Sequence, residues 1–347
     1  MKKIVRQVAG IDVAQKELVV SLGRMYEDLS TEIHAFKTFP NHEKGFSALL
    51  IWSEKIADPA IPIRFVMEAT GVYHESLAYY LAEKRLAVTI VLPSKISNFF
   101  RTLDIKTITD KTASQAIATF GLERNLTTWQ PPKKVFRVIR QLTRERDQLI
   151  AERTVLKNQS HAEQAEAFPN KGSLTRLKER IRVLNKQEKQ IMAEIAVIIK
   201  QDEELKKIIA IICTIPGVGL LTAACVLGET NGFELIRNKK QITSYAGLDV
   251  KEKESGTSVK GKPRISKRGN RHLRKAMHMP SLTIIRKDER FKAMYARLIS
   301  KHGIKMKACV AVQRKLLEMI YTLHKTKQTY NKDYFKQGGN DQNKVAA

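Results

Sequence analysis

The sequence is poor in cysteine, with three such residues among 347. No two of them form a Cys-x-x-Cys pair and no histidines cluster beside them, so neither a disulfide framework nor a zinc site is supported. They lie in apolar stretches that are typical of helices. We therefore expect Cys213, Cys225 and Cys309 to be small buried hydrophobic side chains.

The N-terminus lacks a long apolar run. Met1-Lys2-Lys3 opens the chain, and Asp12 interrupts the apolar residues that follow. A signal peptide or a membrane span needs an unbroken apolar stretch. We therefore expect no membrane partner and a cytoplasmic location in a reducing compartment.

Acidic residues are scarce, with 35 Asp and Glu against 62 Lys and Arg, and the imbalance is uneven. Residues 1–130 hold 16 basic and 14 acidic residues, and residues 131–206 hold 17 and 11. Residues 207–347 hold 29 and 10, a net charge of +19. This distribution predicts that nucleic acid is bound mainly by the last part and cut near the first. A basic binder without catalytic activity is the alternative that charge alone leaves open.

Apolar runs near the N-terminus alternate with amphipathic stretches. Four runs have the length and composition of strands: 5–11, 18–22, 63–67 and 88–92. The stretches typical of helices are 45–55, 73–84, 95–103 and 111–120. A short polar turn joins the first two strands, which predicts a hairpin. The alternation as a whole predicts an α/β layer fold for residues 1–130.

Glycine is almost absent between residues 135 and 212, where Pro169 and Gly172 are the only punctuation. Leu, Ile and Val recur there every three or four residues, which predicts helices that pack along a narrow seam. We expect a coiled-coil helical hairpin over 131–206 that folds back at Pro169-Asn170. Such an arm can also pair with a second copy of the chain, so a homodimer or homotetramer is predicted.

The rest of the chain is expected to be mainly helical, with a basic domain over 207–325 and a loose polar tail over 326–347. The turn Thr214-Ile215-Pro216-Gly217-Val218-Gly219 precedes an apolar helix. It resembles the hairpin of helix-hairpin-helix DNA binders, in which backbone N–H groups at a helix start contact a phosphate. A plain turn between two helices is the alternative.

Three acidic residues follow or interrupt apolar runs of the α/β part: Asp12, Glu68 and Asp110. Mg²⁺ prefers oxygen ligands, and carboxylates that lie close together repel one another until a cation is bound. The three are therefore predicted to form a divalent-metal site. Taken singly, Asp12 could be a turn residue and Asp110 the N-cap of a helix.

A basic Ser/Gly segment near the C-terminus is the second candidate site. Ser255 could act as a nucleophile because cations around it would stabilise an alkoxide and a phosphate, and Ser258 and Ser266 compete on the same basis. Basic residues of this segment are expected to contact nucleic-acid phosphates: Lys260, Lys262, Arg264, Lys267, Arg268, Arg271, Arg274 and Lys275.

Seven short motifs occur in an order and spacing that resemble the DEDD-type transposases of bacterial insertion sequences (the insertion sequence 110 family), which include the Piv-type invertases. They are Gly10-Ile11-Asp12-Val13, Met67-Glu68-Ala69-Thr70-Gly71, Thr109-Asp110-Lys111, Ile215-Pro216-Gly217-Val218-Gly219, Tyr245-Ala246-Gly247-Leu248, Ser255-Gly256 and Ile265-Ser266-Lys267-Arg268-Gly269-Asn270. The resemblance covers nearly the whole chain.

The resemblance implies a RuvC-like (ribonuclease H-type) N-terminal domain, a coiled-coil arm and a C-terminal transposase domain. It places the first three acids of the family on Asp12, Glu68 and Asp110, with Mg²⁺ as cofactor, and its serine on Ser255. It further implies that this serine forms a covalent link to double-stranded DNA, that a partner subunit supplies the acidic domain, and that an element-encoded bridge RNA guides the reaction. Such a bacterial protein would be associated with the nucleoid when it acts.

One position departs from the family pattern. The Asp-x-x-Asp of the family would put a fourth acid at position 113, where this chain has Ala113. Either three carboxylates suffice with water as a further ligand, or Thr112, Ser114 or a more distant acid substitutes. Asp104 is the nearest other acid, but its sequence context does not fit the pattern.

Three functions compete on this reading. A DNA recombinase is the first. A catalytically silent nucleic-acid binder is favoured by Ala113, and a RuvC-like junction nuclease would hydrolyse DNA without a covalent intermediate. A covalent protein–DNA adduct would separate the recombinase from the other two.

Overall fold

The computed structural model describes residues 2–69, 71–103, 107, 109–234, 236–251, 254–255, 259–261 and 264–332, with only the backbone at 254, 255, 259 and 260. The chain divides into two compact units, Met1–Pro131 and Pro132–Ala347.

The first unit is built on a five-stranded sheet of order β3-β2-β1-β4-β5. Its strands are β1 (Ile4–Val13), β2 (Glu17–Tyr26), β3 (Thr31–Pro40), β4 (Ile63–Glu68) and β5 (Ala87–Val91). β1, β2 and β3 pair antiparallel, whereas β4 runs parallel to both β1 and β5. The strand β3 was not predicted, because it is an edge strand whose side chains are mostly exposed. The apolar alternation of Ile33, Ala35 and Phe39 is interrupted at Lys37.

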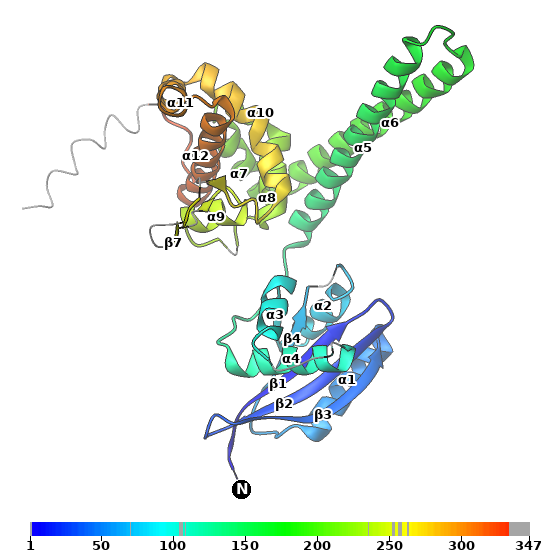
Figure 1. Ribbon diagram of the computed structural model, residues 1–347. Helices are drawn as coiled ribbons and strands as arrows, with labels where there is room; N and C mark the ends of the chain where they lie inside the picture. Colours follow the sequence, from blue (N-terminus) through cyan, green and yellow to red (C-terminus); the bar gives the residue numbers. More distant parts are fainter. Residues whose placement is uncertain are drawn as a thin grey trace, which may run out of the picture. The chain divides into compact units, whose positions relative to one another are not determined.

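Helices cover both faces of this sheet (Figure 1). They are α1 (Glu43–Ile56), α2 (Glu75–Glu83), α3 (Pro93–Phe100) and α4 (Asp110–Glu123). Ile11 and Met67 belong to the core that includes residues of α1 and α2, while Val8 and Val66 belong to the core with residues of α3 and α4. The α/β prediction for this part of the chain is therefore confirmed.

The second unit begins with two long helices, α5 (Lys134–Gln164) and α6 (Lys171–Gln201), which run side by side (Figure 1). Leu156, Leu177 and Leu184 form a small core between them. The side chain of Asn170 caps α6 by accepting a hydrogen bond from the Ser173 N–H at 3.1 Å. The reversal therefore lies at the predicted Pro169-Asn170 position, where this cap starts the second helix.

The remaining helices enclose one large apolar core. They are α7 (Glu203–Cys213), α8 (Leu220–Thr230), α9 (Lys239–Tyr245), α10 (Arg271–Lys287), α11 (Glu289–His302) and α12 (Lys305–Thr326). Cys309 is buried as expected, but Cys213 and Cys225 are only partly buried. Within the described ranges no helix is long and apolar enough to cross a membrane.

Two short strand pairs project from this helical unit. β6 (Val250–Lys251) pairs antiparallel with β9 (Arg264–Ile265), and β7 (Glu254–Ser255) pairs with β8 (Val259–Lys260). The pair β6 and β9 closes the base of the segment that contains Ser255.

Candidate active site

Strand register places Asp12 and Glu68 at the same edge of the sheet. Ile11 of β1 and Met67 of β4 are partners in a parallel pair, and each acid is the next residue along its strand. Side chains alternate between the faces of a strand. Because Ile11 and Met67 lie in the core beneath α1 and α2, the two carboxylates point to the opposite face.

The helix α4 covers that opposite face, and Gly10 permits its close approach. A Cβ at Gly10 would lie 2.2 Å from the backbone N of Ala118 and 2.5 Å from the carbonyl oxygen of Ser114. Only a residue without a side chain fits under the helix at this point. This packing brings the start of α4, where Asp110 lies, to the edge that carries Asp12 and Glu68.

Asp110 is the first residue of α4 rather than its cap. Thr109 is the N-cap, and its side chain and that of Thr112 form a reciprocal capping box with the backbone. The alternative role of Asp110 as an N-cap is therefore wrong. A carboxylate in the first turn also lies where the helix dipole favours negative charge.

The three acids influence one another electrostatically. Burial raises the pKa of Asp12 from 3.8 to about 6, and the charges of Asp110 and Glu68 add to that shift. A pKa raised by two neighbouring carboxylates indicates negative charge that a cation would stabilise. The donor set of three carboxylates therefore fits a hard divalent ion in its chemistry.

The side-chain geometry does not form a closed ligand set. Within the described part of the chain, no group of three or more His, Cys, Asp or Glu side chains lies close enough together to hold a metal ion. Binding of a cation would therefore require these side chains to move closer together.

The neighbours of Ala113 that could replace a fourth acid are already engaged. Ser114 is fully buried, and its hydroxyl lies 2.8 Å from that of Ser21. The Thr112 hydroxyl accepts the Thr109 N–H at 2.8 Å within the capping box. These contacts direct neither hydroxyl to the sheet edge that carries Asp12 and Glu68. Asp104, the nearest other acid, lies outside the described residues.

The basic segment follows the β6 and β9 pair and leads into α10. Ser266 donates a hydrogen bond to Asp249 Oδ1 at 2.6 Å and accepts one from the Arg268 N–H at 3.3 Å, so its hydroxyl holds a turn. Ser258 and Lys262 lie outside the described residues, and only the backbone of Ser255 and Lys260 is described.

The predicted phosphate-binding residues divide into two groups. Arg264, Lys267, Arg268 and Arg271 are exposed and available for contact. Arg274 is engaged within the fold, whereas Lys275 is exposed but paired with an acid. Arg274 Nη1 donates to the carbonyl oxygens of Ala246 at 2.8 Å and Gly269 at 3.2 Å. Lys275 Nζ pairs with Asp147 of α5 at 2.9 Å.

A buried ionic cluster at the base of this segment was not predicted. The carboxylate of Glu229 accepts two hydrogen bonds from Arg144 of α5, at 2.6 and 2.8 Å, and one from Asn270 Nδ2 at 2.6 Å. The Tyr245 hydroxyl donates to the Glu229 carbonyl oxygen at 2.9 Å. Asn270 also caps α10 by accepting the His272 N–H at 2.9 Å.

The charge of Glu229 is stabilised by this cluster. Burial alone would raise its pKa, but the hydrogen bonds from Arg144 and Asn270 outweigh that effect and lower it. A single Glu in the otherwise apolar stretch of α8 was the available signal, since a lone acid in such a context is costly to bury without a partner. The identity of the partner was not readable from the sequence, because Arg144 lies 85 residues away.

Two family models match the chain. The first, a model of the DEDD transposases of IS110 elements that is described as a transposase, matches residues 9–169. The other is described as the transposase IS116/IS110/IS902 family and matches residues 209–296. Between them they match most of the first compact unit and part of the second.

Similar proteins have been described in several bacteria. The pilin gene-inverting protein of Moraxella bovis is 27% identical over 300 residues, which is 85% of this chain and 90% of that protein. The transposase for insertion sequence element IS1111A of Coxiella burnetii is 28% identical over 143 residues, 40% of this chain and 37% of that protein. Among solved structures, RuvC of T. thermophilus in complex with a Holliday junction substrate is 10% identical with a TM-score of 0.28, covering 35% of this chain and 99% of RuvC.

Proposed function

Because this chain belongs to the IS110 family of transposases and is therefore a DNA transposase or recombinase, we propose that it cuts and rejoins DNA with an acidic site and a serine nucleophile. The acidic site consists of Asp12, Glu68 and Asp110, and the nucleophile is Ser255. The observation that carries the acidic part is the strand register that sets Asp12 beside Glu68, with Asp110 at the start of α4. Burial raises the pKa of Asp12, and the charges of Asp110 and Glu68 add to that shift.

A divalent cation, Mg²⁺ by this proposal, would be held by the three carboxylates and would neutralise charge on a DNA phosphate. The residues of the chain prepare its site. Gly10 lets α4 lie against β1. Thr109 caps that helix, so the Asp110 carboxylate is not needed as a cap and can serve as a metal ligand beside Asp12 and Glu68. Ala113 contributes no oxygen, so water would complete the ligand shell.

The serine step is a phosphoryl transfer. The Ser255 oxygen forms a bond to phosphorus as the bond to a DNA sugar oxygen breaks; the serine proton is lost and the leaving oxygen gains one. Rejoining reverses this, because a sugar hydroxyl of another DNA end displaces Ser255. Exposed Arg264, Lys267 and Arg268 near the base of the segment would hold the negatively charged phosphates during both steps.

The units divide the work in this proposal. The RuvC-like unit supplies the acids, and the helical unit supplies the serine and most of the positive charge, with double-stranded DNA as substrate and an element-encoded bridge RNA as guide. The helices α5 and α6 serve as a coiled-coil arm through which two or four copies associate. Val155, Val183 and Val197 on these helices are more than half exposed, which supports contact with another copy.

The test is to trap and map a covalent protein–DNA adduct. The native chain and Ser258→Ala should form the adduct, whereas Ser255→Ala should bind DNA without forming one. Mixing Asp12→Asn with Ser255→Ala chains should restore part of the activity if acids and serine come from different subunits. Failure to detect an adduct under any condition would favour hydrolysis or simple binding. An adduct mapped to Ser258 or Ser266 would assign the nucleophile to that residue instead.

A further inference from the structure

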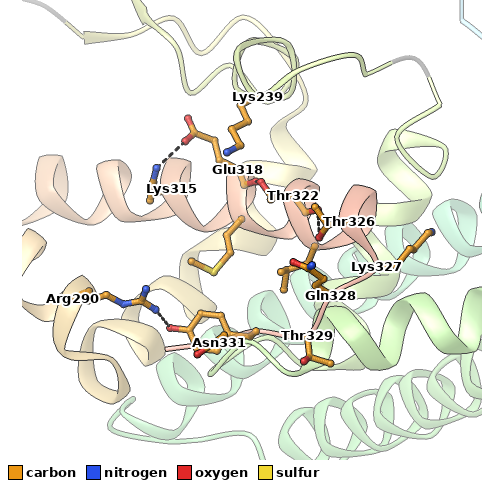
Figure 2. Close-up of a pocket in the computed structure, with 13 residues that line it drawn as sticks. Lys239, Arg290, Lys315, Glu318, Thr322, Thr326, Lys327, Gln328, Thr329 and Asn331 are labelled. Atoms are coloured by element: carbon orange, nitrogen blue, oxygen red, sulfur yellow. Dashed lines mark hydrogen bonds and ion pairs between the residues drawn. The ribbon is translucent and has the colours of Figure 1, made fainter. Parts of the chain in front are cut away.

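The helical unit contains a cavity of about 710 Å³ beside the C-terminal half of α12 (Figure 2). Its lining comes from α9, α11, α12 and the segment 327–331 that follows α12. Pockets of roughly 300–1,000 Å³ suit small organic ligands. This volume therefore admits one nucleotide, but a nucleic-acid duplex is too wide to enter.

The lining is strongly basic. Four of its residues are cationic and one is acidic: Lys239, Arg290, Lys315, Lys327 and Glu318. Glu318 is already paired, because its carboxylate lies 3.2 Å from Arg314 Nε and 3.6 Å from Lys315 Nζ. In Figure 2, Lys239 lies near Glu318, while Lys327 and Gln328 lie at another part of the wall. The cavity therefore attracts anions and offers cations at separate points.

One wall is fixed by a buried ionic contact. Asp288 is 3% exposed and accepts a hydrogen bond from the Tyr330 hydroxyl, which in turn accepts one from Arg290 Nη2 at 2.6 Å. The Tyr330 N–H donates to the Thr214 hydroxyl at 2.8 Å. These contacts tie Tyr330, which follows α12, to Thr214 and to the start of α11. The cavity is thus formed before any ligand arrives.

The remaining lining suits a base. Met319 and Leu323 provide apolar surface, and the Gln328 amide offers both a donor and an acceptor. The Thr322 hydroxyl donates to the Glu318 carbonyl oxygen at 2.8 Å and so keeps its acceptor lone pairs. A nucleotide has complementary parts: an apolar base face, a polar base edge and flanking phosphates.

We propose that this cavity binds one unpaired nucleotide of a nucleic-acid strand. The base lies against Met319 and Leu323, and the two flanking phosphates are bound by Lys239 and Lys327. The volume and the basic lining of the cavity indicate the size and the negative charge of the ligand. That the ligand belongs to a nucleic-acid strand rests on the proposed function.

The experiment uses the full-length chain and a fluorescent 12-nucleotide strand that carries one photoreactive thio-base. Ultraviolet crosslinking followed by peptide mapping should place the base on the peptide that contains Met319 or Leu323. Lys239→Ser with Lys327→Ser should weaken binding at least tenfold. It should also lower the slope of log affinity against log salt by about 1.4, since each phosphate contact contributes about 0.7 for a single strand.

Two controls separate the cavity from general positive charge. Thr322→Trp fills the cavity without changing the net charge and should abolish the mapped crosslink. Lys301→Ser with Lys305→Ser removes the same charge from exposed positions that do not line the cavity, and should keep the crosslink. Circular dichroism of each variant verifies that the helices are intact.

The outcomes are distinct. Unchanged affinity and crosslinking in Thr322→Trp, or equal weakening by both pairs of lysine substitutions, would overturn the proposal. DNA and RNA versions of the strand, together with competition by a free mononucleotide, identify the source of the nucleotide. Because crosslinking needs no catalysis, it is measured without divalent ions, so failure of the recombination proposal leaves this result interpretable.

Discussion

Arg144 of α5 and Glu229 of α8 form a bidentate ion pair, with N–O distances of 2.6 and 2.8 Å. The Glu229 side chain is 1% exposed, and its second interaction, with Asn270, reaches the residue that caps α10. One carboxylate therefore joins the first long helix to the start of the helix that follows the serine-bearing segment. This relationship makes the position of that segment depend on a residue of α5.

Glu229→Gln should loosen the start of α10. The substitution keeps the shape of the side chain but removes the charge that both partners contact, at a cost of about 2 kcal/mol in unfolding free energy. The amides of His272 and Leu273, which Asn270 caps, should exchange with solvent hydrogen faster. In the native chain the ionised Glu229 carboxylate stabilises the fold at neutral pH. This stabilisation is lost as pH falls below 4.5, the ordinary pKa of Glu, and through the lowered pKa of Glu229.

Glu188→Gln is the matched control for that experiment. Glu188 bridges α6 to α5 through Arg146 at 2.8 Å and through Arg153, but it does not contact the α10 cap. It should therefore destabilise the long helices and leave exchange at His272 unchanged. Equal exchange at His272 in both variants would show that Glu229 acts only on global stability.

Gly10→Ala should destabilise the first unit by about 2–3 kcal/mol, because its Cβ would overlap backbone atoms of α4 that cannot rotate away. Gly23→Ala, in the neighbouring strand, meets side-chain atoms only, the nearest being Leu122 Cδ1 at 2.9 Å, and should cost about 1 kcal/mol. Urea unfolding followed by tryptophan fluorescence measures both, because Trp52 and Trp129 are the two tryptophans of the chain and both lie in the first unit. Similar costs for the two alanines would contradict the close packing of α4.

The pKa of Asp12 predicts a specific pH response. Because this pKa is about 6 in the folded chain and 3.8 in its ordinary state, the folded protein binds the extra proton more tightly. The resulting stabilisation is complete below pH 3.8 and is lost as pH rises through 6. Without divalent ions at pH 8, Asp12→Asn should therefore unfold at a higher temperature than the native chain, as measured by tryptophan fluorescence.

Addition of Mg²⁺ at pH 8 should reverse that order by stabilising the native chain only. An ion bound to the folded state raises its stability in proportion to the logarithm of ion concentration above the dissociation constant. An equal response of both proteins to Mg²⁺ would remove Asp12 from the metal site.

The exposed cations near α10 should dominate the salt dependence of DNA binding. Replacing Lys267, Arg268 and Arg271 by Ser should lower the slope of log affinity against log salt by about 2.7, if each contacts one phosphate of a duplex. The control replaces three exposed lysines of the first unit by Ser, namely Lys44, Lys55 and Lys84. Its slope should differ little from that of the native chain. Fluorescence anisotropy between 50 and 200 mM salt, roughly the range in which such contacts are read, provides the comparison.

The sequence makes Asp12 and Glu68 candidates because they adjoin apolar strands whose periodicity is local. Asp12 and Glu68 could be placed at one sheet edge once the strands were recognised, since parallel neighbours end on the same side. The role of Thr109 was less accessible, because Thr109 and Asp110 are both good N-caps and only the backbone angles decide between them.

Contacts over long sequence separations account for what was missed. The pair of Ser21 with Ser114 joins residues 93 positions apart, and it removes Ser114 from the candidate metal ligands. Arg274 looked like its exposed basic neighbours, yet it donates to the backbone carbonyl oxygen of Ala246, 28 residues away. Neither arrangement leaves a periodic pattern that a sequence can reveal.

The pairing of β6 with β9 has a practical consequence for protein engineering. Val250 is opposite Ile265, and the Ser266 N–H donates to the Asp249 carbonyl oxygen at 2.8 Å, so both ends of the intervening segment are fastened to each other. Doubling the length of a closed loop costs only about 0.6 kcal/mol. The length of the segment around Ser255 can therefore be changed at little cost to the helical scaffold, which makes this segment a place where altered chemistry could be introduced by design.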